Sequence, residues 1–71
     1  MRTISHHLHL IDEHQAARRL GLKVKTLRRW RWAGQGPAFR KIGSAVRYAE
    51  EDIAAFIEAA RRRSTSDPGA P

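Results

Sequence analysis

The side chains with the clearest chemistry lie in the segment KVKTLRRWRWAG, Lys23 to Gly34. It contains five basic residues, one threonine and two tryptophans. Arginine and lysine donate hydrogen bonds to guanine and to phosphate, and threonine contacts a thymine methyl group or a phosphate. A merely solvated basic face would also contain glutamates that pair with the cations, and this segment has none. The composition therefore favours a helix that lies in a nucleic-acid groove.

The distribution of charge around this segment also indicates a polyanionic partner. The formal net charge is +7, and all seven acidic residues lie outside positions 14–49. Ordinary solubilising charge would mix both signs. We expect the cations in this interval to have no internal partner, so that an external polyanion relieves their mutual repulsion. They are Arg18, Arg19, Lys23, Lys25, Arg28, Arg29, Arg31, Arg40, Lys41 and Arg47.

The composition bounds the class of protein. A chain of 71 residues forms one small domain, which disfavours a large buried active site. Because no cysteine occurs, there is no disulfide, thiolate nucleophile or cysteine zinc site, and we expect a cytoplasmic protein. The apolar runs are too short for a membrane span or a signal peptide. No nucleophile and base pair, acidic Mg²⁺ cluster or glycine-rich phosphate loop is recognisable, so we expect neither catalysis nor a cofactor.

Four histidines remain as candidate metal ligands. His6, His7 and His9 lie close together, and alternating histidines can chelate a metal weakly. Since neither cysteine nor an acidic residue lies near them, we expect a flexible neutral arm and no metal site. His14 is expected on the surface of the first helix.

The elements that position the basic segment have recognisable boundaries. Asp12 and Gln15 form a capping box before a helix over about 13–20, which ends at Gly21. A second helix over about 24–33 carries most of the basic segment and ends at Gly34.

A hairpin is predicted next. GQGP cannot continue a helix, and FRKI and VRYA flank the short turn GSA. If GSA is the loop, Ile42 and Val46 face the core, and Lys41 lies opposite Arg47. If GS is a two-residue loop, Arg40 pairs with Arg47 instead. Both registers oppose like charges, which implies an external anion.

A last helix closes the domain. The acidic residues 50–52 suit a helix N-terminus, and an apolar stripe follows before three arginines at 61–63. We therefore expect a flexible arm over 1–9, a folded domain over 10–63 and a disordered tail over 64–71. The stripe consists of Ile53, Phe56, Ile57 and Ala60.

The first two helices fit the pattern of a helix-turn-helix. A small Ala17 lets the helices cross closely, and Gly21 lets the chain turn with a positive φ. The order of elements predicts a mainly α fold with a β-hairpin wing, that is, a winged helix-turn-helix. The positions that fit are Ala16, Ala17, Leu20, Gly21, Leu22, Leu27 and Trp30. Of these, the large side chains are expected to fill the angle between the two helices: Leu20, Leu22, Leu27 and Trp30.

Helix geometry then identifies the free face of the second helix. With Leu27 and Trp30 as the buried edge, the residues about half a turn away face outward. Trp32 is placed either under the hairpin or toward a ligand. The outward residues are Lys25, Arg28, Arg29 and Trp32, with Thr26 on the flank.

The stretch LGLKVKTLRRWRWAGQGPAFRKIGSAVRYAEEDIAAFI resembles the small winged helix-turn-helix module of phage and mobile-element excisionases and their AlpA-like and MerR-like relatives. The resemblance covers about residues 10–58, and its most specific parts are the LG turn, TLRRW, GPAFRKIG, VRY and EDIAAFI. It implies that the second helix enters the major groove of DNA and that the hairpin lies along the adjacent backbone or minor groove. The residues it implies as contacts are Lys25, Thr26, Arg28 and Arg29 on the helix and Arg40, Lys41, Ser44 and Arg47 on the wing.

The sequence departs from this family at Lys23. The family usually has a serine or threonine there to cap the recognition helix, and lysine cannot accept that hydrogen bond. We expect the helix start to fray until a phosphate binds, and Lys23 to be a further DNA contact.

The resemblance implies an excisionase that directs site-specific recombination. Such a protein binds adjacent sites cooperatively, self-associates head to tail on double-stranded DNA, bends it and favours excision by an integrase, either a tyrosine or a serine recombinase. A small transcriptional regulator would share every contact. A protein-binding adaptor or inhibitor would instead use Trp32 and the surface of the last helix.

Overall fold

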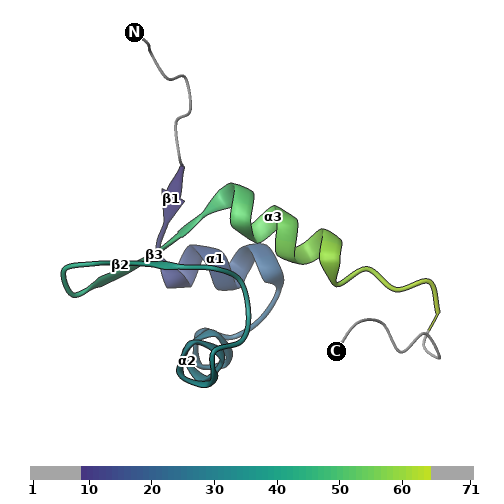
Figure 1. The fold of residues 1–71 in the computed structure, drawn as a ribbon, viewed down its shortest axis with the longest axis horizontal. Helices are drawn as coiled ribbons and strands as arrows, with labels where there is room; N and C mark the ends of the chain where they lie inside the picture. The colour runs from purple at the N-terminus through teal and green to yellow at the C-terminus, as the bar shows by residue number, and fades with distance from the viewer. Residues whose placement is uncertain (1–8, 65–71) are drawn as a thin grey trace, which may run out of the picture.

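A computed structural model describes residues 9–64 of the chain. Three helices and a three-stranded antiparallel sheet form a winged helix-turn-helix, as the sequence predicts (Figure 1). Within this described part, no helix has the length and apolar character needed to cross a membrane. Apart from His9 and Ser64, the predicted flexible arm and tail lie outside the described residues. The elements are β1 (Leu10–Ile11), α1 (Glu13–Leu20), α2 (Val24–Ala33), β2 (Arg40–Ile42), β3 (Ala45–Ala49) and α3 (Glu50–Ala59).

Helix α1 has the predicted boundaries because both halves of its capping box form. The Asp12 side chain accepts a hydrogen bond from the Gln15 backbone N–H at 2.8 Å, and the Gln15 side chain accepts one from the Asp12 backbone N–H at 3.0 Å. These bonds satisfy two backbone donors. The helix ends at Gly21, which has a left-handed conformation.

Helix α2 also has the predicted boundaries, between Lys23 and Gly34. As expected, the Lys23 side chain makes no capping hydrogen bond. The loop after the helix lies against Trp30, because a Cβ atom at Gly36 would be only 2.7 Å from the Trp30 ring. This close approach leads the chain from α2 toward the wing.

The wing is a two-residue hairpin, so the three-residue GSA register is wrong. Arg40 pairs with Arg47, while Lys41 lies opposite Val46. Ile42 lies opposite Ala45 and is 54% exposed, so it does not join the core. The reason is Gly43, whose positive φ of 63° at the first loop position is what a two-residue type II′ turn uses.

The sheet gains a strand that the sequence pattern did not indicate. The order is β1-β3-β2, and β1 pairs with β3 through Leu10 with Ala49 and Ile11 with Tyr48. Strand β3 is therefore central, and it leads directly into α3 (Figure 1).

Helix α3 uses only part of its predicted apolar stripe. Ile53 is buried, and Phe56 packs with its ring centroid 5.6 Å from that of Trp30. Ile57 and Ala60 are exposed, so this part of the stripe does not join the core. The C-terminal end of α3 extends beyond α1, and the small core does not reach it (Figure 1).

The core lies where α1, α2, α3 and the sheet meet. The predicted Leu27, Ala16 and Ala17 are buried, and Leu20 and Trp30 are partly buried. Leu22 is exposed in the turn between α1 and α2, so the expectation that it helps to fill the angle between the helices is wrong. The fully buried side chains also include one that was not predicted, Tyr48.

Candidate nucleic-acid interface

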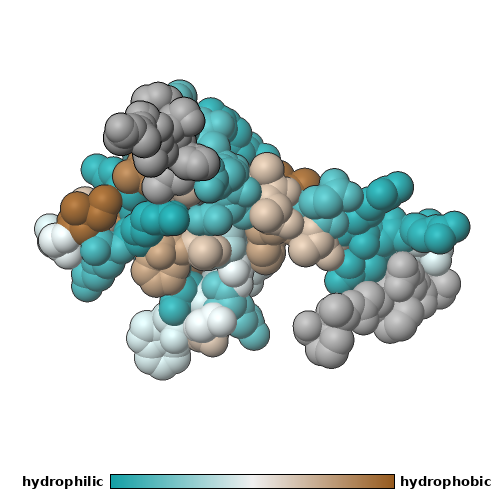
Figure 2. All heavy atoms as spheres, turned by 45° about the horizontal axis from the view of Figure 1, so that its top comes forward, coloured by the Kyte–Doolittle hydropathy of each residue, from teal (hydrophilic) through white to brown (hydrophobic). Residues whose placement is uncertain are grey.

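The outward face of α2 carries exposed cations and an exposed aromatic ring. Lys25 and Arg29 are exposed, and within residues 9–64 neither forms an ion pair. Thr26 is half-buried on the flank, as predicted. Trp32 is 92% exposed, so it does not pack under the hairpin. Figure 2 shows a face of the molecule on which hydrophilic side chains predominate and hydrophobic ones form smaller patches.

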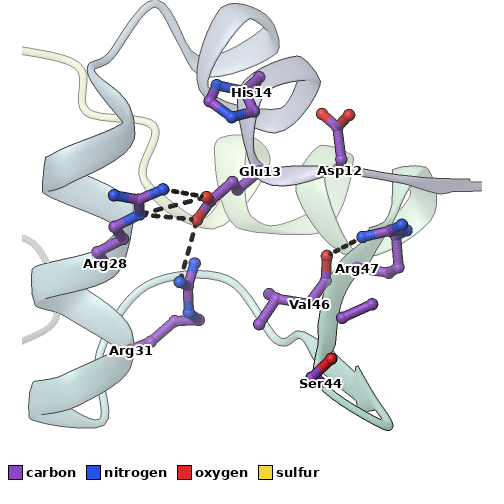
Figure 3. A pocket seen from close by; sticks show the side chains of 9 residues that line it. Asp12, Glu13, His14, Arg28, Arg31, Ser44, Val46 and Arg47 are labelled. Carbon is purple, nitrogen blue, oxygen red and sulfur yellow. Dashed lines mark hydrogen bonds and ion pairs between the residues drawn. The ribbon is translucent and has the colours of Figure 1, made fainter.

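Arg28 differs from these residues because Glu13 holds it. Its Nε–H donates to both carboxylate oxygens of Glu13 at 3.2 Å, and its Nη2 donates to Oε2 at 2.6 Å (Figure 3). Hydrogen bonds from Arg28 lower the pKa of Glu13 from 4.5 to about 2, burial opposes this shift, and Arg31 adds to it. The carboxylate is thus ionised at neutral pH, and Arg28 stays charged beside it.

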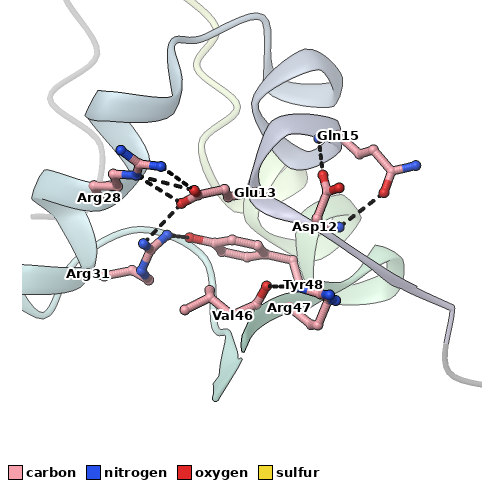
Figure 4. Close-up of polar contacts among 8 residues, drawn as sticks. All are labelled: Asp12, Glu13, Gln15, Arg28, Arg31, Val46, Arg47 and Tyr48. Carbon is pink, nitrogen blue, oxygen red and sulfur yellow. Dashed lines mark hydrogen bonds and ion pairs between the residues drawn. The ribbon is translucent and has the colours of Figure 1, made fainter. Parts of the chain in front are cut away.

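Arg31 connects this ion pair to the core. It donates through Nη2 to Glu13 at 3.1 Å and through Nη1 to the hydroxyl of Tyr48 at 2.9 Å (Figure 4). Its guanidinium carbon lies 5.7 Å from the centre of the Phe39 ring, within the range of a cation–π contact. Arg31 is therefore a structural link between α2 and the sheet.

These contacts correct the expectation that the cations between 14 and 49 have no internal partner. Arg28 and Arg31 pair with Glu13, Arg19 pairs with Glu50 at 2.7 Å, and Arg40 pairs with Asp52 at 2.8 Å. The three acids lie just outside positions 14–49 in the sequence, in the first turns of α1 and α3. Because α1 packs against α2 and α3 packs against α1 and β3, these acids can reach cations inside that stretch. The fold thus pairs some of the cations between positions 14 and 49 with acids and leaves Lys25 and Arg29, on the outer face of α2, without an ion pair in the described residues.

The wing presents the four residues predicted there, on two faces. Arg40 and Arg47 are directly opposed, so their side chains share one face. Arg47 is half-buried and donates to the carbonyl oxygen of Val46 at 2.8 Å. Lys41 is exposed on the other face, because successive side chains of a strand alternate. Ser44 is exposed in the turn.

An open concavity of about 520 Å³ separates α2 from the wing. Arg28, Arg31 and Glu13 line it on one side, and Ser44 and Arg47 line it on the other (Figure 3). The concavity is therefore lined by one predicted contact of the helix, Arg28, and by two predicted contacts of the wing, Ser44 and Arg47. The free cations Lys25 and Arg29 lie outside the concavity on α2.

Glu13 is the site residue that sequence reasoning missed. An acidic residue in the first turn of a helix is usually explained by its favourable interaction with the helix dipole. The sequence therefore gives no separate indication that Glu13 pairs with arginines of another helix. Among residues 9–64, no group of three potential ligands is placed to hold a metal ion. His6 and His7 lie outside the described residues, and His9 and His14 are exposed.

Comparison with known proteins supports the architecture. A family model described as a helix-turn-helix domain matches residues 14–61. No curated protein matches the chain. The matched range contains α1 except its first residue, the turn, α2, the wing and all of α3, so the chain belongs to this helix-turn-helix family, which includes excisionase and AlpA-like DNA-binding domains.

Proposed function

We propose that the protein is a sequence-specific architectural DNA-binding protein that acts as an excisionase. One observation carries the DNA-binding part of this proposal. The outer face of α2 holds Lys25 and Arg29 without an ion pair in the described chain, and no acidic residue occurs between positions 14 and 49. Such a face destabilises a free protein and is stabilised by phosphates.

In the proposed complex, α2 lies in the major groove and the wing follows the neighbouring backbone. The major groove admits one α-helix, and residues on its free face reach the base edges. At the start of α2, backbone N–H groups have no side-chain cap, so a phosphate can take that place beside Lys23. Lys41, Arg40 and Arg47 on the wing hold phosphates and fix the register of α2.

The excisionase role needs several copies on one DNA. A single small DNA-binding module buries only about 600 to 1,000 Å² of its surface, which limits the specificity of one copy. We propose that copies bind neighbouring sites head to tail, bend the duplex and help an integrase to assemble the excision complex. The protein contributes no chemistry and takes no cofactor in this role, and it acts at the bacterial nucleoid.

The experiment begins with selection of duplexes from a randomised pool by the purified protein. Affinity is then measured on the selected duplex and on a scrambled one across a salt series. We expect tighter binding to the selected duplex and a steep loss of affinity with salt, because each neutralised phosphate releases counterions. Salt-insensitive binding, or equal affinity for both duplexes, would contradict DNA recognition and favour a protein-binding adaptor.

A second assay tests the excisionase role alone. An integrase encoded beside the gene is incubated with a DNA that carries both attachment sites, with and without the protein. We expect excision to depend on the protein. Cooperative DNA binding without any effect on excision would refute this role and leave a transcriptional regulator.

A further inference from the structure

We propose that Glu13 is a positioning residue that determines specificity, because it holds the Arg28 guanidinium in the orientation that reads a guanine. This inference rests on the proposed DNA binding and names one base that the protein would recognise. It assigns Glu13, an acid at the start of α1, a role in the interface formed by α2.

The first argument is the geometry of the guanidinium. Arg28 uses its Nε–H and one N–H of Nη2 on Glu13. The remaining N–H groups belong to Nη1 and to the outer side of Nη2. This outer edge is a planar fork of two donors, which matches the O6 and N7 acceptors of guanine in the major groove. The Arg28 side chain is 59% exposed, so this edge is accessible.

The second argument is the rigidity of the support. The Glu13 side chain is only 17% exposed, and Arg31 also donates to it. Arg31 is bound in turn to the hydroxyl of Tyr48, which is 1% exposed. A chain of contacts thus runs from the core through Arg31 and Glu13 to Arg28. Releasing Arg28 would deprive a mostly buried carboxylate of a partner, which is costly. A side chain that is already ordered loses less conformational freedom when it binds.

The third argument selects the base over the backbone. A phosphate brought to Arg28 would lie near the negative charge of Glu13, whose lowered pKa keeps it ionised. Guanine O6 and N7 are neutral acceptors and do not meet this repulsion. Within residues 9–64, Lys25 and Arg29 form no ion pair with an acidic residue, so neither is held beside a negative charge that would repel a phosphate. Glu13 therefore gives Arg28 a preference for a base over a phosphate.

The test compares Glu13→Gln and Arg28→Ala with the wild type by selection from one randomised duplex pool. A matched control is Glu50→Gln, which also removes one negative charge from an arginine pair, but that pair joins Arg19 of α1 to the start of α3 and includes no residue of α2. We expect the wild type and the control to select a guanine at one position. Both test variants should lose this preference, by about tenfold in the ratio of selected to substituted duplex.

A modified base identifies the contact directly. Replacing the selected guanine by 7-deazaguanine removes the N7 acceptor. This change should weaken the wild type and the control about tenfold and leave Arg28→Ala unaffected. Glu13→Gln should bind the scrambled duplex more tightly than the wild type, with a salt slope larger by about one ion, because Arg28 becomes free to meet a phosphate.

Several results would overturn the proposal. Retention of the guanine preference in folded Glu13→Gln would show that the carboxylate has a structural role only. If Arg28→Ala lost the same affinity for the selected and the scrambled duplex and kept the guanine preference, Arg28 would contact the DNA backbone and not a base. If Glu13→Gln fails to fold, Arg28→Lys tests the same point, because lysine leaves Glu13 paired with Arg31 and lacks the fork; a guanine preference kept by this variant would refute the idea. A wild type without any base preference would refute the proposed function instead.

Discussion

Acid should destabilise this protein partly by protonating Glu13, because the pKa of this carboxyl group is lower in the folded chain than in the unfolded one. In the folded chain, the hydrogen bonds from Arg28 hold the pKa at about 2, against an ordinary value of 4.5. A carboxyl group whose pKa is lower in the folded state stabilises the fold above the unfolded pKa, and this contribution is lost as the pH falls toward the folded pKa. The free energy of unfolding should therefore fall between about pH 5 and pH 2.

The size of this loss follows from the same shift. Each pKa unit corresponds to about 1.4 kcal/mol, so a fall from 4.5 to about 2 corresponds to about 3 kcal/mol at neutral pH. A domain of 71 residues has a total stability of roughly 4 to 10 kcal/mol. A contribution of this size would be a substantial part of the stability of the fold, which the following experiment measures.

The assay is chemical denaturation of the wild type and Glu13→Gln at several pH values between 7 and 2. We expect the wild type to be more stable at pH 7 and the difference to shrink toward zero at pH 2, because glutamine does not titrate. Glu50→Gln is the control; the pKa of Glu50 is also lowered, by Arg19, but its exposed ion pair should give a smaller change. A difference between wild type and Glu13→Gln that stays constant with pH would refute this reasoning.

Further predictions concern DNA contacts, the core and assembly. Arg29→Ala should cost about 1 to 3 kcal/mol on the selected duplex and much less on a scrambled one, whereas Arg47→Ala should weaken both and lower the salt slope by about one ion. Identical specificity ratios for the two variants would mean that Arg29 does not read a base. Leu27→Ala, in the fully buried core, should lose about 2 to 5 kcal/mol in a thermal melt; a loss below 1 kcal/mol would contradict its burial. Electrophoretic titration on two adjacent sites should show cooperative filling, and truncation before Leu10 or after Arg63 should weaken this coupling more than single-site binding; independent filling would exclude head-to-tail assembly.

The helices could be predicted because their limits depend on residues close in sequence. Asp12 with Gln15 begins α1, and Gly21 and Gly34 end the first two helices, without reference to the rest of the fold. Strand β1 could not be predicted, because two residues give no alternation and its pairing with β3 joins distant parts of the chain.

The site was predictable in composition and less so in arrangement. The outward positions of Lys25 and Arg29 follow from helical periodicity once Leu27 is buried. The pairing of Arg28 with Glu13 depends on the angle at which α1 and α2 cross, which no local pattern contains. Ile42 was misplaced for a related reason: an apolar residue in a strand suggests burial, and only the fold shows that the hairpin tip lies beyond the core.

The position of β2 at the edge of the sheet has a consequence for the solubility of the free protein. All three of its residues are exposed, and the side away from β3 offers unpaired backbone groups to which another chain could add a strand. Arg40 and Lys41 occupy this edge, and charged residues there discourage such pairing. We therefore expect their neutralisation to promote aggregation as well as to weaken DNA binding. Substitutions in β2 are then limited by two separate requirements, DNA binding and protection of the sheet edge against pairing with another chain.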